Sequence, residues 1–224
     1  MLARQGSKRI LIGRGGAVQR ATLRYPPGSL VVLTGLPGAG KTTLLRRLYG
    51  LHGAESAPVA AGAVVVIDSG QSRLRWDGRI AWAPRPVRRA VVFATHLSRI
   101  RRALIRGQSV LAHNRGCATY VLKGFAWLAR RQRASFHLLL LDAPAEAAIA
   151  GQHARGRVVA PRTFARHRRR WESLLARVAD GDPAPAATAR VVTRAEADLL
   201  EHIVFDSVAG SVAGSAVDSR AHGT

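Results

Sequence analysis

Residues 35–42, Gly-Leu-Pro-Gly-Ala-Gly-Lys-Thr, constrain the fold more than any other stretch of this chain. They match the pattern Gly-x-x-x-x-Gly-Lys-Ser/Thr, in which glycines let successive backbone N–H groups converge on a phosphate. The apolar run at residues 30–33 predicts a buried strand before the pattern, and leucines at positions 44, 45, 48 and 51 predict an amphipathic helix after it. Strand, glycine-rich loop and helix are the context that this motif requires. The sequence therefore predicts a nucleoside-triphosphate site.

The residues of this loop have distinct expected roles. The Lys41 ammonium would contact the β- and γ-phosphates of the nucleotide, and the Thr42 hydroxyl would ligate Mg²⁺. The positive end of the helix that begins near Lys41 adds to the attraction for phosphate. A glycine-rich turn without a ligand is the alternative. The nucleotide-binding residues predicted from the motif are Gly35, Leu36, Pro37, Gly38, Ala39, Gly40, Lys41, Thr42 and Thr43.

The rest of the chain alternates apolar strands with longer amphipathic segments. Strands are predicted at 30–33, 63–67, 109–113, 136–141 and 189–193, and helices at 42–48, 87–106, 118–132, 145–154, 162–179 and 194–203. This alternation requires crossover connections, so we expect an α/β P-loop NTPase fold with a five-stranded, mostly parallel sheet and helices on both faces. We expect one domain at residues 29–206, after a basic N-terminal arm or short strand pair at 1–28 and before a disordered tail at 207–224.

Hydropathy and cysteine content argue against a membrane or secreted protein. No stretch approaches the ~18 apolar residues of a membrane span, and residues 1–9 lack the apolar segment of a secretion signal. Cys117 is the only cysteine, which excludes an internal disulfide and a cysteine-based zinc site. We therefore expect a cytoplasmic protein with no membrane contact.

The charge of the chain is strongly positive, with a net value of +22. One interpretation is a polyanionic partner such as RNA or DNA, since arginine side chains neutralise phosphates and release counterions. The other is a general preference for arginine, because only Lys8, Lys41 and Lys123 are lysines. Aromatic residues make up 5% of the chain and are not interleaved with the basic ones, as they usually are in base-stacking modules. Nucleic acid is therefore one candidate partner among others.

Polar residues directly after predicted strands are the candidates for a second substrate site. Ligands of open parallel sheets bind at the carboxyl ends of strands, so Asp68 could accept the proton of a substrate hydroxyl while Arg73 or Arg75 holds that substrate. The alternative for Asp68 is an Asx turn at Asp-Ser-Gly. His113 could contact substrate or be a hydrogen-bonded histidine at a strand end. Asp142 is followed by Ala-Pro, so we interpret it as a structural residue or helix cap rather than a metal ligand.

Residues 152–157, Gln-His-Ala-Arg-Gly-Arg, place two arginines around a glycine between two predicted helices. On a mobile lid, Arg155 and Arg157 would neutralise charge on a transferred phosphoryl group and exclude water. A solvated basic face is the alternative. We expect the arginines between positions 166 and 170 of the next helix to be solvated, and Trp171 to belong to the core.

Together these features resemble the small P-loop kinases, the group that includes polynucleotide kinase, zeta-toxin, chloramphenicol phosphotransferase and gluconate kinase and is often labelled as AAA-family ATPases. The resemblance covers roughly residues 29–204 and rests on the loop at 35–43, Asp68 followed by Arg73, the strand with an Asp-x-Pro end at 138–144, and the Arg-Gly-Arg lid. It implies ATP and Mg²⁺ as cofactors, Asp68 as the acceptor base, and Arg155 and Arg157 on the transferred phosphate. Two departures are the His-Asn-Arg end of the third strand, where such kinases commonly have an acid, and Gln152, where an additional arginine is often found.

We therefore predict a phosphotransferase that moves the γ-phosphoryl group of ATP to a hydroxyl acceptor, either a nucleic-acid end or a small molecule. The acceptor would be selected by residues 70–107. One alternative is an ATP hydrolase or switch module, although no glutamate follows Asp142 and no Leu-Ser-Gly-Gly sequence occurs. Another is a non-catalytic nucleotide- and RNA-binding protein, in which Asp68→Ala would leave activity unchanged.

Overall fold

The computed structural model describes residues 21–114, 117–156 and 158–206. The main sheet contains all five predicted strands, which are β2 (Leu30–Thr34), β4 (Val64–Asp68), β5 (Ser109–His113), β6 (Phe136–Asp142) and β7 (Thr188–Thr193). They run parallel in the order β4-β5-β2-β6-β7. A further strand, β3 (Val59–Ala61), pairs antiparallel with β4 at the edge. The sheet therefore has six strands. The prediction of five strands was wrong because it did not include this short edge strand.

Strand β2, which leads into the glycine-rich loop, lies inside the sheet between β5 and β6. All five of its residues are buried, and so are those of β4 and β5. Continuous apolar runs of this kind are typical of parallel strands covered on both faces. The strand order brings the carboxyl end of β2 next to those of its two neighbours, and the register pairs Asp68 of β4 with His113 of β5.

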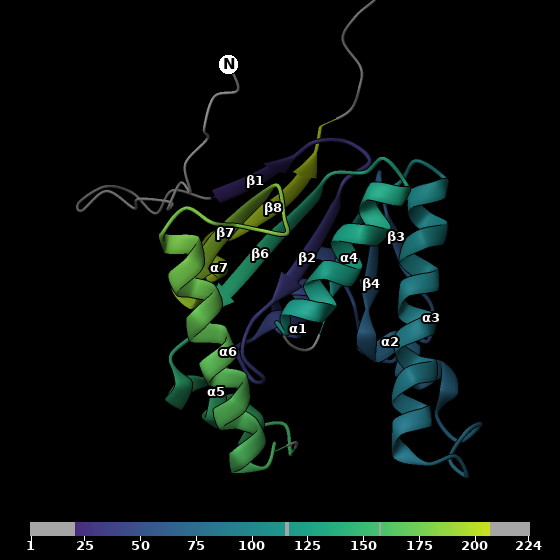
Figure 1. Cartoon of the computed structure of the whole chain (residues 1–224), viewed down its shortest axis with the longest axis vertical. Helices are drawn as coiled ribbons and strands as arrows, with labels where there is room; N and C mark the ends of the chain where they lie inside the picture. Colours follow the sequence, from purple (N-terminus) through teal and green to yellow (C-terminus); the bar gives the residue numbers. More distant parts are fainter. Residues whose placement is uncertain (1–20, 115–116, 157, 207–224) are drawn as a thin grey trace, which may run out of the picture.

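Helices cover both faces of the sheet (Figure 1). Helices α3 (Arg85–Ile105) and α4 (Thr119–Arg131) pack on one face, whereas α1 (Lys41–Tyr49) and α7 (Arg194–Leu199) lie on the other. Helices α5 (Ala145–His153) and α6 (Pro161–Ala179) lie between β6 and β7 in the chain. Except for the last helix, the predicted helices match to within two residues at each end. None of the helices in the described ranges is long and apolar enough to cross a membrane.

A separate sheet of two parallel strands joins β1 (Ala21–Tyr25) to β8 (Leu200–Phe205). The helix predicted at 194–203 is wrong in its second half, because α7 ends at Leu199 and the chain becomes extended. Leu200, Ile203 and Phe205 are buried in the strand, and the Ile-Val-Phe sequence favours extended backbone. Strand β1 falls within the predicted arm, while residues 1–20 of that arm and the predicted tail at 207–224 lie outside the described residues.

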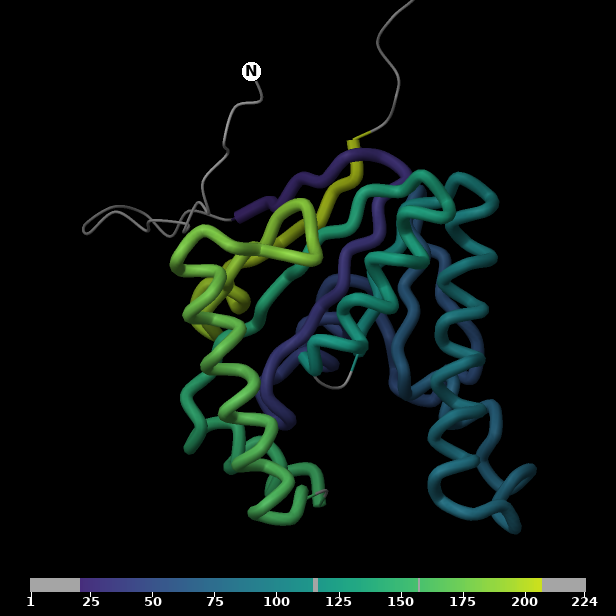
Figure 2. Tube along the Cα trace, viewed as in Figure 1, coloured from purple at the N-terminus to yellow at the C-terminus, as the bar shows by residue number. Residues whose placement is uncertain are grey.

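The carboxyl ends of the parallel strands meet at one end of the molecule. Figure 2 shows two helical limbs that continue past this end on opposite sides, one formed by α5 and α6 and the other by the lower part of α3 with its preceding segment. The glycine-rich loop, Asp68 and His113 all lie at this end, because each directly follows or ends a parallel strand. The two limbs therefore stand on either side of the candidate site.

Candidate nucleotide and acceptor site

The glycine-rich loop bends tightly against helix α5. Gly38 and Gly40 have φ angles of 96° and 101°, in the left-handed region that favours glycine. A Cβ atom at Gly38 would lie 1.8 Å from the carbonyl oxygen of Ala148, and one at Gly151 would lie 2.6 Å from the carbonyl oxygen of Gly38. The loop and the helix can approach this closely because both contact positions are glycine.

Lys41, the first residue of α1, directs its ammonium group back across the loop. Its Nζ donates to the carbonyl oxygen of Gly35 at 2.9 Å and to that of Leu36 at 2.7 Å, and the residue is buried. Thr42 and Thr43 lie in the first turn of α1, where backbone N–H groups lack intrahelical partners and attract phosphate. A loop that curls around an ammonium group at a helix N-terminus fits the predicted site for nucleotide phosphates.

Asp68 ends β4 and caps α2 (Ser69–Trp76), a helix that the sequence analysis did not predict. Asp68 Oδ1 accepts a hydrogen bond from the backbone N–H of Gly70 at 2.6 Å, and the Asp68 N–H donates to Gln71 Oε1 at 3.0 Å. This reciprocal pair is a capping box, and the spacing Asp-Ser-Gly-Gln is the sequence signal that could have revealed the helix. The local turn at Asp-Ser-Gly is confirmed, and it holds the carboxylate at the end of the sheet.

His113 lies beside Asp68 at the end of the neighbouring strand. The Nδ1 atom of His113 is 3.0 Å from Asp68 Oδ1, and both residues are buried. The contact follows from the sheet itself, since the two residues are register partners in adjacent parallel strands. It fixes the orientation of the Asp68 carboxylate and accounts for a histidine at this strand end.

A second buried histidine, His96 on α3, lies close to this pair. It is 1% exposed, and neither of its ring nitrogens has a hydrogen-bond partner within the described part of the chain. Burial and, to a lesser extent, the neighbouring His113 lower the pKa of His96 to about 4, although Asp68 acts in the opposite direction. The ring is therefore neutral at pH 7 and carries one donor and one acceptor nitrogen. His96 is not predictable from the sequence as a site residue, because a single histidine in an amphipathic helix forms no local motif.

Asp142 ends β6 and links that strand to helix α6. Its Oδ1 accepts a hydrogen bond from Trp171 Nε1 at 3.1 Å, and Trp171 is buried in the core as predicted. This contact supports the structural interpretation of Asp142. The alternative role as a helix cap is wrong, because the N-cap of α5 is Pro144.

Gln152 connects the glycine-rich loop to the segment between α5 and α6. Its Nε2 donates to the carbonyl oxygen of Pro37 at 3.0 Å, and its Oε1 accepts from the backbone N–H of Val159 at 2.8 Å. Arg155 is exposed, and its Nε donates to the carbonyl oxygen of Gly151 at 2.8 Å. Arg157 lies outside the described residues. The lid roles of the two arginines therefore stay predictions.

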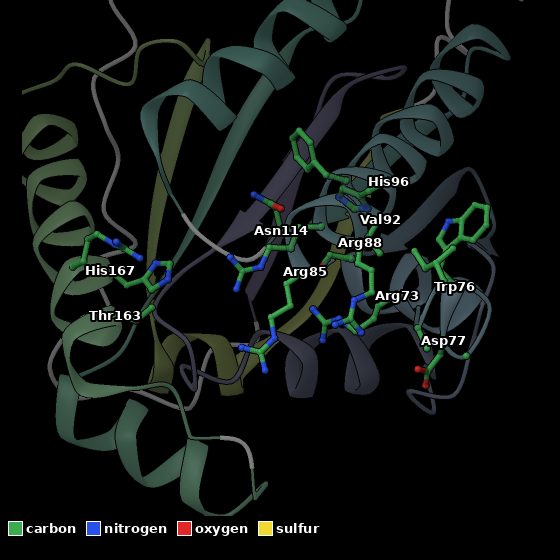
Figure 3. A pocket seen from close by; sticks show the side chains of 17 residues that line it. Arg73, Trp76, Asp77, Arg85, Arg88, Val92, His96, Asn114, Thr163 and His167 are labelled. Carbon is green, nitrogen blue, oxygen red and sulfur yellow. The ribbon is translucent and has the colours of Figure 1, made fainter. Parts of the chain in front are cut away.

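A cleft of about 860 Å³ opens between the two limbs. Residues of α2, of α3 and of the segment that joins them form one wall, and Thr163, Arg166 and His167 of α6 lie on the other side (Figure 3). The cleft reaches Ser69 and Asn114, the chain neighbours of Asp68 and His113. Its arginines are Arg73, Arg85, Arg88, Arg89 and Arg166, whereas Asp77 is the one carboxylate among the described residues that line it. The structure thus places Arg73, which is predicted to bind the acceptor substrate, in a strongly basic cleft.

Several residues of this cleft were not identified from the sequence. Arg166 is exposed, as expected, but it also lines the cleft. Three arginines in the first turns of α3 were overlooked, namely Arg85, Arg88 and Arg89. They share a helical face with His96, so the available signal was their spacing of three and four residues rather than a motif.

Residues 30–180 match the AAA_33 family, which is described as an AAA domain. The chain belongs to this family. The match covers both the glycine-rich loop and the arginine-bearing walls of the cleft. This match confirms the predicted relationship of the AAA_33 chain to the small P-loop kinases. Together with the fold, it also confirms the predicted α/β architecture and the assignment to nucleotide-binding proteins.

Individual proteins resemble this AAA_33 chain over different lengths. A chain in the structure of the Pnkp1/Rnl/Hen1 RNA repair complex aligns with a TM-score of 0.54 and 15% identity, covering 68% of this chain and 47% of that one. Shikimate kinase from Acinetobacter baumannii, solved with shikimate, aligns with a TM-score of 0.44 and 18% identity over 77% of this chain and 87% of the kinase. In sequence, 63 residues are 44% identical to the phosphonates import ATP-binding protein PhnC of Frankia casuarinae, covering 27% of this chain and 23% of PhnC. The chain thus spans less than half of the RNA-repair chain and about a quarter of PhnC.

Proposed function

We propose that this protein is an ATP-dependent phosphotransferase that moves the γ-phosphoryl group of ATP to a hydroxyl acceptor. The observation that carries the proposal is the cleft of about 860 Å³ that reaches the chain neighbours of Asp68 and His113, at the same end of the sheet as the glycine-rich loop. Its volume is that of a small-molecule site, whereas hydrolysis of ATP requires room for only one water molecule. A cleft of this size at the sheet end that carries the phosphate-binding loop is suited to a second substrate.

In this proposal, residues 35–43 hold the nucleotide. Lys41 would contact the β- and γ-phosphates in addition to, or in place of, the two loop carbonyls that it contacts here. Thr42 would ligate Mg²⁺, which when bound neutralises charge on the phosphates during transfer. Arg155 and Arg157 would be lid residues that reach the transferred phosphate when the lid closes.

Asp68 acts as the base in this proposal, and Arg73 binds the acceptor. The acceptor oxygen forms a bond to the γ-phosphorus while the bond from that phosphorus to the departing ADP oxygen breaks, and the hydroxyl proton passes to the Asp68 carboxylate. A carboxylate has about four acceptor positions, so the cap to Gly70 and the contact with His113 are compatible with a further hydrogen bond. His113 is a positioning residue for Asp68.

The variant Asp68→Asn separates the capping role of this residue from its proposed chemical role. Asparagine keeps an oxygen that can cap α2, but it cannot take up a proton at neutral pH. We expect transfer to fall by about 10²- to 10⁴-fold, while the affinity for ATP and the thermal unfolding midpoint stay close to those of the native protein. The measurement is transfer of label from γ-labelled ATP, with Mg²⁺, to 5′-hydroxyl oligonucleotides and to a pool of metabolites.

Lys41→Ala is the control, since it should reduce ATP binding and transfer together. An Asp68→Asn variant as active as the native protein would remove Asp68 as the base. Label released only as free phosphate would instead favour the hydrolase or switch, and ATP binding without release of label would favour a non-catalytic nucleotide- and RNA-binding protein.

A further inference from the structure

One face of helix α3 presents three kinds of side chain to the cleft in succession. The spacing of three and four residues puts them on one side of the helix. In chain order they are the basic Arg85, Arg88 and Arg89, the apolar Val92 and Phe93, and finally His96. The cleft therefore has a charged mouth, an apolar middle and a polar end.

The polar end of this stripe adjoins the proposed base. His96 is 1% exposed with no hydrogen-bond partner for its ring nitrogens in the described ranges, and both His113 and Asp68 act on it electrostatically. Asn114 lines the same cleft. A buried polar group without a partner costs free energy, and a polar group of a bound ligand would remove that cost. This end is therefore suited to the hydroxyl end of an acceptor.

The apolar middle of the cleft includes an aromatic side chain in a defined orientation. The indole Nε1 of Trp76 donates to Thr95 Oγ1 at 2.8 Å, and that hydroxyl donates to the carbonyl oxygen of Val91 at 2.8 Å. The first bond anchors α2 to α3, the second lies within α3, and together they fix the orientation of the Trp76 ring, which lines the cleft. Together with Val92 and Phe93, this ring favours an acceptor with an apolar body.

The cleft carries a large excess of positive charge, which its own carboxylate does not neutralise. Five arginines line the cleft against the single carboxylate of Asp77, counted over the described lining residues. Guanidinium groups bind phosphate oxygens through paired, charge-assisted hydrogen bonds. A phosphate monoester, with up to two negative charges at neutral pH, matches this excess better than a single carboxylate does.

We propose that the acceptor is an alcohol that also carries a phosphate group, with the phosphate at Arg85 and Arg88 and the hydroxyl at Asp68. The proposal rests on the phosphotransferase function and names the acceptor class for that same site. Because an α-helix rises about 1.5 Å per residue, Arg88 and His96 are separated by about 12 Å along α3. With the phosphate beside Arg88 and the hydroxyl between His96 and Asp68, these two groups of the acceptor lie about that far apart, and the apolar body lies between them.

The test uses straight-chain ω-hydroxyalkyl phosphates of increasing length, each paired with the diol that lacks the phosphate. We expect kcat/KM for transfer from ATP to be at least about tenfold higher for the phosphate-bearing member of a pair. The preference should rise with chain length until the phosphate-to-hydroxyl distance reaches about 12 Å. The double variant Arg85→Gln/Arg88→Gln should lose the preference, while Arg101→Gln, an exposed arginine of the same helix that is not among the cleft residues, should keep it.

Calorimetric titration of the same compounds without ATP separates this inference from the phosphotransferase function. Equal transfer to both members of each pair would overturn the phosphate-bearing acceptor and leave the phosphotransferase standing. Binding of the phosphates that is lost in the folded double variant, with no transfer, would support the ligand class and contradict the phosphotransferase. Transfer to a 5′-hydroxyl oligonucleotide is then compared with transfer to the free hydroxyalkyl phosphates. The faster acceptor shows whether the phosphate belongs to a nucleic-acid strand or to a metabolite. Either preference supports the proposal if the double variant loses it.

Discussion

Asp68, His113 and His96 are three buried ionisable side chains that lie close together, His96 in the lining of the cleft and the other two next to its lining residues Ser69 and Asn114. Asp68 and His113 meet because the register of β4 and β5 pairs them, and His96 approaches from a helix on the face of the sheet. Asp68 and His113 contact each other, whereas the His96 ring is buried and neutral. Protonation of this buried imidazole opposes folding, which makes His96 a source of pH-dependent stability.

We expect acid to lower the free energy of unfolding through His96. Its pKa is about 4 in the folded protein against an ordinary value of 6.5, so between these values the unfolded chain binds more protons than the folded one. The stability contribution is complete above about pH 6.5 and is lost as the pH falls toward 4, by on the order of 3 kcal/mol. Urea unfolding at several pH values should show a smaller loss for His96→Gln than for the native protein. Equal losses in both would contradict this assignment.

At the scale of secondary structure, long and fully buried elements are predictable from the sequence, whereas short or exposed ones are not. The five parallel strands were predicted because fully buried strands are continuous apolar runs. Strand β3 has three residues, none of them buried, and so gives no such signal. The first four residues of β8 fall within the helix predicted at 194–203, because the pairing of this strand with β1, about 180 residues away, decides its conformation. Contacts distant in sequence override local preference in such cases.

The candidate site was predictable to the extent that its residues are contiguous. The glycine-rich loop was found in full, since one short motif contains its chemistry. For the cleft, the sequence indicated a broad acceptor region at 70–107 and a role for Arg73, but not the cleft itself, because its walls combine α2, α3 and α6. The chain between Arg73 and Arg166 passes through two strands of the sheet before the second wall begins. Nothing in a linear sequence shows that Arg85 and His167 face one cleft (Figure 3).

The link between the loop and the segment after α5 leads to a prediction about these elements. Gln152→Ala removes the hydrogen bonds to Pro37 and Val159, so we expect the affinity for ATP to fall about tenfold. Trypsin should also cleave faster after Arg155. Both effects follow because one side chain holds the loop and the following segment together. Gln108→Ala, in the turn before β5, is the matched control, and unchanged ATP affinity together with unchanged cleavage in Gln152→Ala would show that the link has no such role.

At the scale of the whole molecule, the net charge of +22 acts beyond the cleft. A 5′-phosphorylated single strand has no free 5′-hydroxyl, so it reports electrostatic binding without 5′ transfer. We expect its affinity to fall about tenfold or more between about 50 and 200 mM salt, because bound phosphates release counterions. The Arg85→Gln/Arg88→Gln variant should keep most of this binding, since it changes two of 35 basic residues. Absence of binding at the lower salt concentration would mean that the charge reflects composition alone.

The contact between Gly38 and Gly151 limits how this protein can change during evolution. A side chain on Gly151 would collide with the backbone of Gly38, and a side chain on Gly38 would collide with the backbone carbonyl of Ala148 one turn earlier on α5. Because both collisions are with backbone atoms, a smaller side chain elsewhere cannot relieve either of them. Relatives that keep α5 against the loop must keep both glycines, and a relative that has lost either one must hold that helix in a different position.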